Sequence, residues 1–266
     1  MPASQIAKET GRRAFGRDPA GYDRSRPDYP EWVYQTLCTR CGLRPGTATF
    51  EIGAGTGKAS RQLLALGADP LVAVEPDPRL AEFLREKSPD PALKLLISSF
   101  EDVVLEEGAF DLGVSATAFH WLDEDVALAK IARLLRPGGW WAAVWNVFRN
   151  DTRPDPFSQV TREVLGEPTN PSEDKKGVPF ALDTVARLEA LNRTGAFDVA
   201  EALTTTWSLI LDADQIMALY ATYSMISMRP DREAVLSELG RIAREQFGGR
   251  VTRNVTTRLY IARRAP

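Results

Sequence analysis

The sequence predicts an α/β fold built on a doubly wound parallel sheet, and three observations carry this prediction. Short apolar strands alternate with amphipathic helices from position 47 to position 147, which is the pattern of consecutive βαβ units. The first strand runs directly into the glycine-rich stretch Gly53-Ala54-Gly55-Thr56-Gly57. The next strand ends on an acidic residue, Glu75. Together these features favour a nucleotide-containing ligand at the carboxyl edge of the sheet.

The composition is that of a globular chain and excludes several classes of protein. Of the 266 residues, 44% are hydrophobic and 26% are charged, which is enough apolar material for a sizeable core. The net charge of -3 and the pI of about 5.5 argue against nucleic acid or a membrane as partner. No apolar run has the length of a signal peptide or a membrane span. Two cysteines do not make a disulfide scaffold, so we expect a soluble, cytoplasmic protein.

The expected elements follow in order along the chain. Residues 1–29 are polar and basic, and a helix is expected over 30–41 because Pro30 suits a first turn and Gly42 ends it. The alternating region then predicts strands at 47–53, 71–75, 93–98, 110–115 and 140–147, and helices at 58–66, 77–87 and 125–135.

Beyond residue 148 the pattern changes. Residues 149–180 are rich in Pro, Asp and Asn and are expected to form a loop with one helix near 157–165. Two long stretches with β-branched residues predict strands at 197–211 and 251–263. The remaining helices are expected at 184–194 and over most of 213–247.

The glycine-rich stretch is the most informative part of the chain. Glycines permit positive φ and a close approach of the backbone to a ligand, and the N–H groups that open the following helix can meet a polar or anionic group. Glu75 lies 18 residues past Gly57, where an acid can accept hydrogen bonds from the hydroxyls of a ribose. The alternative is a tight turn that merely lets the helix pack on the sheet.

The spacing of the glycines separates two classes of cofactor. A dinucleotide site uses G-x-G-x-x-G, whereas this chain has G-x-G-x-G with Lys58 where the third glycine would stand. Glu51 precedes the first glycine by two residues, and its carboxylate would repel a pyrophosphate but balance a cation. An adenosine that carries a sulfonium and an amino-acid tail therefore fits better than NAD.

The stretch from Glu51 to Gly57 resembles motif I of the class I S-adenosylmethionine-dependent methyltransferases, which reads acid-x-Gly-x-Gly-x-Gly. Three further segments resemble that family in order and spacing, namely residues 72–75, 110–115 and 134–139. The resemblance implies a Rossmann-like methyltransferase fold, with a mostly parallel sheet of seven strands, an antiparallel last strand and a helical cap. It implies S-adenosylmethionine as cofactor, with contacts from Glu51, Gly53, Ala54, Gly55, Gly57, Glu75, Phe100, Glu101 and Ser115.

The family resemblance also implies a division of the chain, in which residues 1–266 form a single methyltransferase domain. The expected parts are an N-terminal lid and helix (1–45), a cofactor-binding core (46–148), a helical substrate cap (149–195 and 213–247) and the last two strands (197–211 and 251–263).

Residues 22–30 resemble the N-terminal segment of a subgroup related to trans-aconitate methyltransferases and their small-molecule relatives. The tripeptide Phe119-His120-Trp121, which follows the fourth strand, also occurs in that subgroup. The residues expected in a lid or against the substrate are Tyr22, Arg26, Tyr29, Trp121, Tyr220 and Tyr223.

His120 is the only histidine of the chain and the candidate catalytic residue. A neutral imidazole at the carboxyl edge of the sheet can take a proton from a hydroxyl, but His120 can equally contact the substrate without proton transfer or be structural. No metal is expected, because the C-x-x-C pair Cys38 and Cys41 lacks further ligands and sits on the apolar face of a helix.

The predicted function is methyl transfer from S-adenosylmethionine to a carboxylate or hydroxyl of a small organic molecule. A nicotinamide-dependent oxidoreductase and a protein that binds S-adenosylmethionine without turnover remain as alternatives. The oligomeric state is left open by the sequence.

Overall fold

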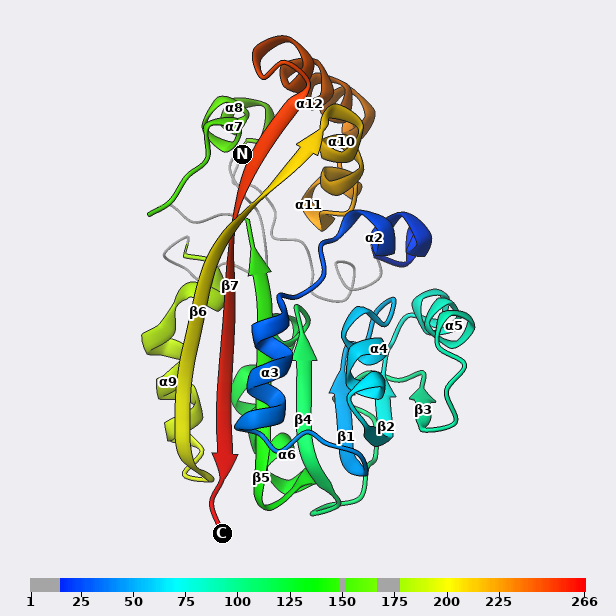
Figure 1. Cartoon of the computed structure of the whole chain (residues 1–266), viewed down its shortest axis with the longest axis vertical. Coiled ribbons are helices and arrows are strands. Elements are labelled where there is room, and N and C mark those ends of the chain that lie inside the picture. Colours follow the sequence, from blue (N-terminus) through cyan, green and yellow to red (C-terminus); the bar gives the residue numbers. More distant parts are fainter. Residues whose placement is uncertain (1–14, 149–151, 167–177) are drawn as a thin grey trace.

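The computed structural model describes residues 15–148, 152–166 and 178–266, and it confirms the predicted α/β fold (Figure 1). A seven-stranded sheet has the strand order β3-β2-β1-β4-β5-β7-β6. Strands β1 to β5 are parallel, and β7 lies antiparallel to both β5 and β6, as expected. The strands are β1 (Thr47–Ile52), β2 (Ala68–Val74), β3 (Leu93–Leu96), β4 (Phe110–Ala116), β5 (Leu135–Val147), β6 (Phe197–Asp212) and β7 (Arg250–Arg264).

Helices cover both faces of this sheet. Helices α3 and α4 pack on one face, where Leu37 and Leu63 are buried against the sheet. Helices α6 and α9 pack on the other face through Ile131 and Leu191. The helical elements are η1 (Phe15–Arg17), α2 (Pro19–Ser25), α3 (Glu31–Thr39), α4 (Lys58–Ala65), α5 (Pro78–Lys87), η2 (Phe119–Trp121), α6 (Glu124–Leu134), α7 (Pro156–Val160), α8 (Arg162–Leu165), η3 (Phe180–Leu182), α9 (Thr184–Arg193), α10 (Ala213–Ala221), α11 (Ser224–Ser227) and α12 (Arg232–Gln246).

The last two strands are long and carry a separate helical layer past the end of the parallel strands (Figure 1). We call the helices α7, α8, α10, α11 and α12 the cap. Their apolar side chains form a core of their own around Phe157, Ile216 and Leu239, to which Val251 of β7 also belongs. The antiparallel pair β6–β7 therefore connects the sheet to the cap without a break.

Two parts of the expected cap differ in the structure. Helix α9 was expected in the cap, but it contacts β6 and α6, because its buried residues Ala190 and Leu191 belong to the main core of the sheet. The single helix expected at 157–165 is divided into α7 and α8 at Thr161, whose hydroxyl donates to the carbonyl of Phe157 at 2.7 Å. Residues 149–151 and 167–177 of the expected cap, and 1–14 of the expected lid, lie outside the described residues.

The turn that enters β5 explains why this strand begins earlier than expected. The expected strand started at residue 140, whereas β5 starts at Leu135 and its register with β4 shifts between Phe110 and Leu112. Gly138 has φ +76°, which is the value that a type II turn after Pro137 requires. The strand therefore includes the turn as an irregular first segment.

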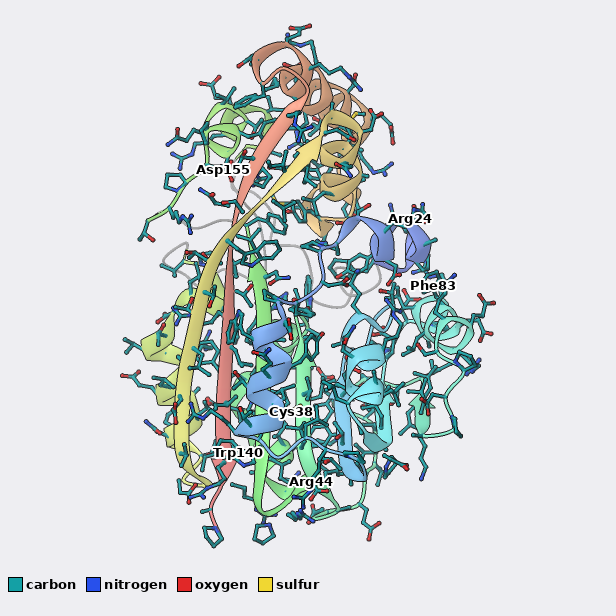
Figure 2. All side chains as sticks on the ribbon, in the orientation of Figure 1. Arg24, Cys38, Arg44, Phe83, Trp140 and Asp155 are labelled. Atoms are coloured by element: carbon teal, nitrogen blue, oxygen red, sulfur yellow. The ribbon has the colours of Figure 1, made fainter. Side chains whose placement is uncertain are left out.

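The described residues contain neither a bilayer-length apolar helix nor a cluster of metal ligands. None of the described helices has the length and apolar character that crossing a membrane requires. No three His, Cys, Asp or Glu side chains of the described chain come together in a way that could hold a metal ion. The free thiols of Cys38 and Cys41 instead belong to the packing of α3 on the sheet (Figure 2).

Candidate active site

The predicted site residues meet at the carboxyl edge of the sheet. Strand order reverses between β1 and β4, and such a reversal is where doubly wound sheets bind ligands. A cavity of about 560 Å³ lies at this edge, bounded by the sheet, the cap and the residues before α3. All of the predicted site residues line this cavity except Gly57 and Ser115.

The glycine-rich loop has the backbone conformation that its sequence predicted. Gly53, Gly55 and Gly57 have φ values of +68°, +58° and +86°, which only glycine adopts without strain. A Cβ on Gly55 would meet no atom closer than 4.0 Å, so at this point the bare backbone faces open space. A Cβ on Gly57 would lie 2.3 Å from Leu84 Cδ1. Gly57 therefore serves the packing of α4 against α5 rather than lining the cavity.

Glu75 ends β2 at the floor of the cavity, where it is 4% exposed. Its carboxylate accepts the N–H of Gly55 at 2.8 Å and the N–H of Asp77 at 2.9 Å. Burial nevertheless raises the pKa of Glu75 to about 7, and these two hydrogen bonds offset only part of that rise. Each carboxylate oxygen still has lone pairs to accept a further donor, which is what the two hydroxyls of a ribose would supply.

Glu51 lies beside Glu75 and is fully buried. One carboxylate oxygen accepts the hydroxyl of Ser60 at 2.5 Å, whereas the other has no partner among the described residues. Burial, with the nearby Glu75 charge, raises the pKa of Glu51 to about 8. A buried carboxylate oxygen without a donor, on the wall of a cavity, fits a cationic ligand group. This is the charge that an amino-acid tail and a sulfonium would bring.

Two further predicted residues lie on the wall and one does not. Phe100 is buried and lines the cavity, with its ring stacked on Phe50 at 6.3 Å between centroids. Glu101 lines the exposed rim. Ser115 was expected to contact the cofactor, but its hydroxyl donates to the carbonyl of Ile52 at 3.0 Å and the residue is fully buried. Ser115 therefore fastens β4 to β1 beneath the cavity.

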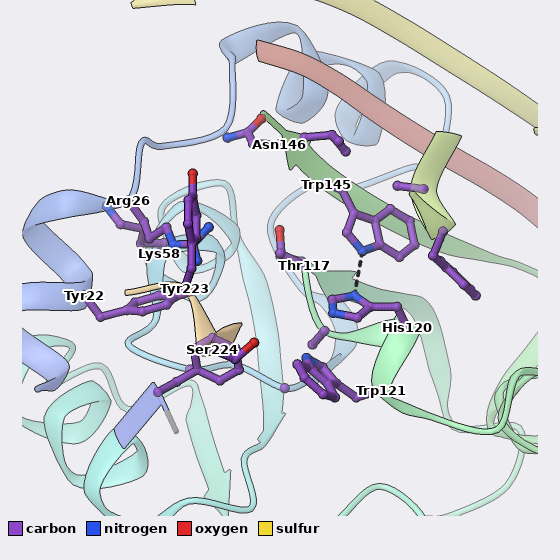
Figure 3. A pocket seen from close by; sticks show the side chains of 18 of the residues that line it. Tyr22, Arg26, Lys58, Thr117, His120, Trp121, Trp145, Asn146, Tyr223 and Ser224 are labelled. Carbon is purple, nitrogen blue, oxygen red and sulfur yellow. Dashed lines mark hydrogen bonds between the residues drawn. The ribbon is translucent and has the colours of Figure 1, made fainter. Parts of the chain in front are cut away.

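His120 is held in a defined ring orientation. The indole N–H of Trp145 donates to His120 Nδ1 at 3.0 Å (Figure 3). Because an indole nitrogen can only donate, Nδ1 must be the unprotonated nitrogen, and in the neutral ring the hydrogen then sits on Nε2. Trp145 falls in the strand predicted at 140–147, and the sequence gave no sign of this contact.

Thr117, on the loop after β4, is a second residue that sequence reasoning did not single out. Its φ of +58° is the only positive value among the described residues other than glycine, and a β-branched residue is rarely found there. Its hydroxyl lies 2.6 Å from the hydroxyl of Tyr29, and both residues line the cavity. Nothing in the sequence marks a threonine that will adopt this backbone conformation.

We define residues 15–30 as the N-terminal strap. Its helix α2 lies between α10 of the cap and α5 (Figure 1), and several strap residues line the cavity. On the cofactor side, Asp23 pairs with Arg61 of α4 at 2.8 Å. On the cap side, Arg26 donates through Nε to Thr222 Oγ1 at 2.8 Å. The strap thus connects the helix after the glycine loop with the cap.

A comparison with known families and relatives identifies the kind of protein. A family model described as a methyltransferase domain matches residues 50–143. An uncharacterized methyltransferase of Mycobacterium tuberculosis is 33% identical over 176 residues, which are 65% of this chain and 68% of that protein. An uncharacterized methyltransferase-like protein of Schizosaccharomyces pombe is 27% identical, and the match covers 90% of this chain and 89% of that protein.

Solved structures give the same fold at lower identity. A candidate type II methyltransferase from Anaeromyxobacter dehalogenans superposes with a TM-score of 0.63 at 22% identity, covering 90% of this chain and 97% of that one. A phosphoethanolamine N-methyltransferase from Haemonchus contortus, solved with phosphomonomethylethanolamine and S-adenosylhomocysteine, has a TM-score of 0.59 at 14% identity and covers 100% of this chain and 62% of that one. These likenesses concern the fold.

We expect Glu75→Gln to weaken binding of S-adenosylhomocysteine at least tenfold, because each charge-assisted hydrogen bond to a ribose hydroxyl contributes about 1.5–3 kcal/mol. The amide keeps the shape of the side chain and one acceptor oxygen for the glycine loop. Calorimetric titration measures the dissociation constant, and Glu86→Gln on the exposed side of α5 is the matched control. An unchanged dissociation constant in the Glu75 variant would remove this residue from the cofactor site.

Binding of S-adenosylhomocysteine should also depend on pH. Ribose hydroxyls bond best to the ionised carboxylate, and the pKa of Glu75 is raised to about 7 in the free protein. Glu75 must therefore lose its proton when the ligand binds. The affinity should fall as the pH drops through about 7 and level off above it. In titrations from pH 5.5 to 8.5, the affinity of Glu75→Gln for S-adenosylhomocysteine should depend less on pH than that of the wild-type protein. The pH dependence that remains would come from Glu51. Equal slopes in both proteins would contradict the assignment.

Cofactor binding should protect the strap from proteolysis. Arg24 is exposed on α2 (Figure 2), and we expect trypsin to cut after it more slowly once S-adenosylhomocysteine occupies the cavity beneath. The Gly55→Val variant is the control, because its added side chain would enter the open space of the glycine loop. Protection in that variant, or equal cleavage of the wild-type protein with and without ligand, would show that the strap does not respond to the cofactor.

Proposed function

The chain belongs to the class I S-adenosylmethionine-dependent methyltransferases, and we propose that its acceptor is a small organic molecule that presents a carboxylate or a hydroxyl oxygen. Within that family we place it near the small-molecule subgroup related to trans-aconitate methyltransferases, on the strength of residues 22–30 and of Phe119-His120-Trp121.

The observation that carries this proposal is one cavity shared by the glycine loop and the cap. Its volume of about 560 Å³ lies within the range of sites for small molecules, and it must hold the cofactor together with the acceptor. The strap and the cap both border it, and concave sites of this kind are typical of small-molecule ligands. The net charge of -3 also argues against a nucleic-acid substrate.

The residues around the acceptor would align it and exclude water. When bound, S-adenosylmethionine would supply a methyl group on its sulfonium, and in-line attack of the acceptor oxygen on the methyl carbon would break the carbon–sulfur bond and release S-adenosylhomocysteine. Glu51 and Glu75 would hold the amino-acid tail and the ribose. The rings of Trp121 and Trp145 and the paired hydroxyls of Tyr29 and Thr117 would confine the acceptor. Such alignment accounts for much of the rate of a displacement between two bound reactants.

The orientation of His120 favours the carboxylate over the hydroxyl. With Trp145 donating to Nδ1 at 3.0 Å, the ring presents an N–H at Nε2 instead of a lone pair that could remove a proton. A hydroxyl acceptor would need that lone pair, whereas a carboxylate is already ionised near neutral pH. We therefore assign to His120 the role of a hydrogen-bond donor that orients the acceptor.

Transfer of tritiated methyl from labelled S-adenosylmethionine into a metabolite extract tests the proposal. We expect label in the fraction of small molecules, and release of volatile label by mild alkali if the product is a methyl ester. The Glu75→Gln variant serves as the control for cofactor-dependent transfer. Label confined to precipitated protein or nucleic acid would contradict a small acceptor, and no label above the control would favour a protein that binds the cofactor without turnover.

Substitution of His120 separates orientation from proton transfer. If His120 orients a carboxylate through Nε2–H, His120→Gln keeps an N–H donor and should retain turnover within about tenfold, while His120→Ala should lose more. If His120 were a general base, both variants should lose about 10²–10⁴-fold. Initial rates at saturating cofactor over a range of pH distinguish these outcomes, and an equal, large loss in both variants would overturn the donor assignment.

A further inference from the structure

Two arginines, and a tyrosine whose hydroxyl has no hydrogen-bond partner among the described residues, line the cap side of the cavity. We propose that Arg26, Tyr223 and Arg253 form a subsite for an anionic group of the acceptor, a carboxylate or a phosphate. All three line the cavity at its cap end, and Figure 3 shows Arg26 and Tyr223 side by side on the wall across from His120. This inference rests on the proposed function, since it describes how the acceptor of that same site is recognised.

The hydroxyl of Tyr223 is the central observation. It is buried and has neither donor nor acceptor partner among the described residues. Buried hydroxyls are nearly always hydrogen-bonded, because leaving one without a partner costs about 1–3 kcal/mol. A residue that lines a ligand cavity and keeps such a hydroxyl is suited to donate to a ligand atom.

Arg26 places a positive charge against the ring of Tyr223. Its guanidinium carbon lies 4.4 Å from the centre of the Tyr223 ring, and two hydrogen bonds to Thr222 hold it there. Within the described part of the chain Arg26 makes no salt bridge, so its charge is free to act on a ligand. Guanidinium groups favour the planar or tetrahedral oxygens of carboxylates and phosphates.

Arg253 supplies a second guanidinium, which forms a buried salt bridge with Asp155 and is fixed by the cap. It is 3% exposed, donates through Nε to Asp155 at 2.9 Å and through Nη1 to the hydroxyl of Tyr220 at 2.7 Å. Its remaining nitrogen, Nη2, donates to none of the described residues. Asp155, labelled in Figure 2, is held in turn as the N-cap of α7, so both partners of this ion pair are held in place.

The charges of both arginines act on the hydroxyl of Tyr223. Burial raises the pKa of Tyr223 to about 12, while the charges of Arg26 and Arg253 oppose that rise. A neutral ligand oxygen would leave this positive field unmatched in a buried place. An anionic oxygen would accept the Tyr223 hydrogen and balance the charges at the same time.

The cavity is therefore polarised from one end to the other. Its cofactor end carries the buried acids Glu51 and Glu75, and its cap end carries Arg26 together with the ion pair of Arg253 and Asp155. The cationic groups of the cofactor and an anionic group of the acceptor would each meet the opposite charge. This arrangement also disfavours binding of either ligand in the other's place.

Titration with three probes that share one benzene ring tests the subsite. Full-length protein, alone and loaded with S-adenosylhomocysteine, is titrated at fixed ionic strength with benzoate, phenyl phosphate and benzyl alcohol. We expect at least one anion to bind at least about tenfold more tightly than the neutral alcohol. Tighter binding of benzoate identifies a carboxylate subsite, and tighter binding of phenyl phosphate identifies a phosphate subsite.

Variants locate the binding of the anion. Tyr223→Phe removes only the unpartnered hydroxyl and should weaken anion binding about fivefold or more, without changing the affinity for benzyl alcohol. Arg26→Gln should weaken it more strongly. The matched control is Tyr34→Phe, which also removes a buried hydroxyl without a partner but lies under α3 outside the cavity. This control should leave the affinity for all three probes unchanged.

Two results would overturn the subsite. One is equal or undetectable binding of all three probes, and the other is an anion affinity that Tyr223→Phe leaves unchanged. Failure of the proposed function is separate, because it would appear as absent binding of S-adenosylhomocysteine or absent methyl transfer. Methyl transfer to a neutral acceptor, with no preference for anionic probes, would leave the proposed function standing and remove the subsite.

Discussion

The carboxylate of Glu75 links three elements that the rest of the site depends on. It ends β2, accepts the N–H of Gly55 at 2.8 Å and accepts the N–H of Asp77 at the start of α5 at 2.9 Å. The contact with Gly55, together with the backbone hydrogen bonds from Gly53 and Ala54 to the carbonyl of Val74, fixes the path of the glycine loop. With the loop in place, the backbone faces the cavity and the neighbouring Glu51 is enclosed behind it. Burying a carboxylate is unfavourable in free energy, and here the buried carboxylate shapes a ligand site.

The sheet and its cofactor loop could be predicted from the sequence because their signals are local. The three glycines, the acid that ends β2 and the alternation of strands and helices each depend on residues close together in the chain. The elements from Thr47 to Val147 accordingly lie within a few residues of their predicted bounds, apart from the early start of β5. Ser115 shows the limit of this reasoning. Its position in a motif did not reveal that its hydroxyl donates a hydrogen bond to the carbonyl of Ile52.

The acceptor side could not be predicted in the same way, because it is assembled from distant parts of the chain. Arg253 lies on a strand whose alternation suggests an ordinary sheet, and only the extension of β7 into the cap buries it beside Asp155. The contact between Trp145 and His120 joins a strand to the loop after another strand. Helix α9 packs on the sheet because its apolar residues fit the main core there. Its helical periodicity predicts an apolar face but not which part of the protein that face will contact.

The strap has a consequence for the order of events in a catalytic cycle. It is bonded to Arg61 of α4 on one side and to Thr222 of the cap on the other. If the strap acts as the predicted lid, a movement wide enough to admit one ligand would release its contacts on both sides, and both ligands would pass through the same opening. Exit of the spent cofactor and exit of the methylated product would then be kinetically coupled, and the pace of turnover would be set by how often this gate opens as much as by the displacement itself.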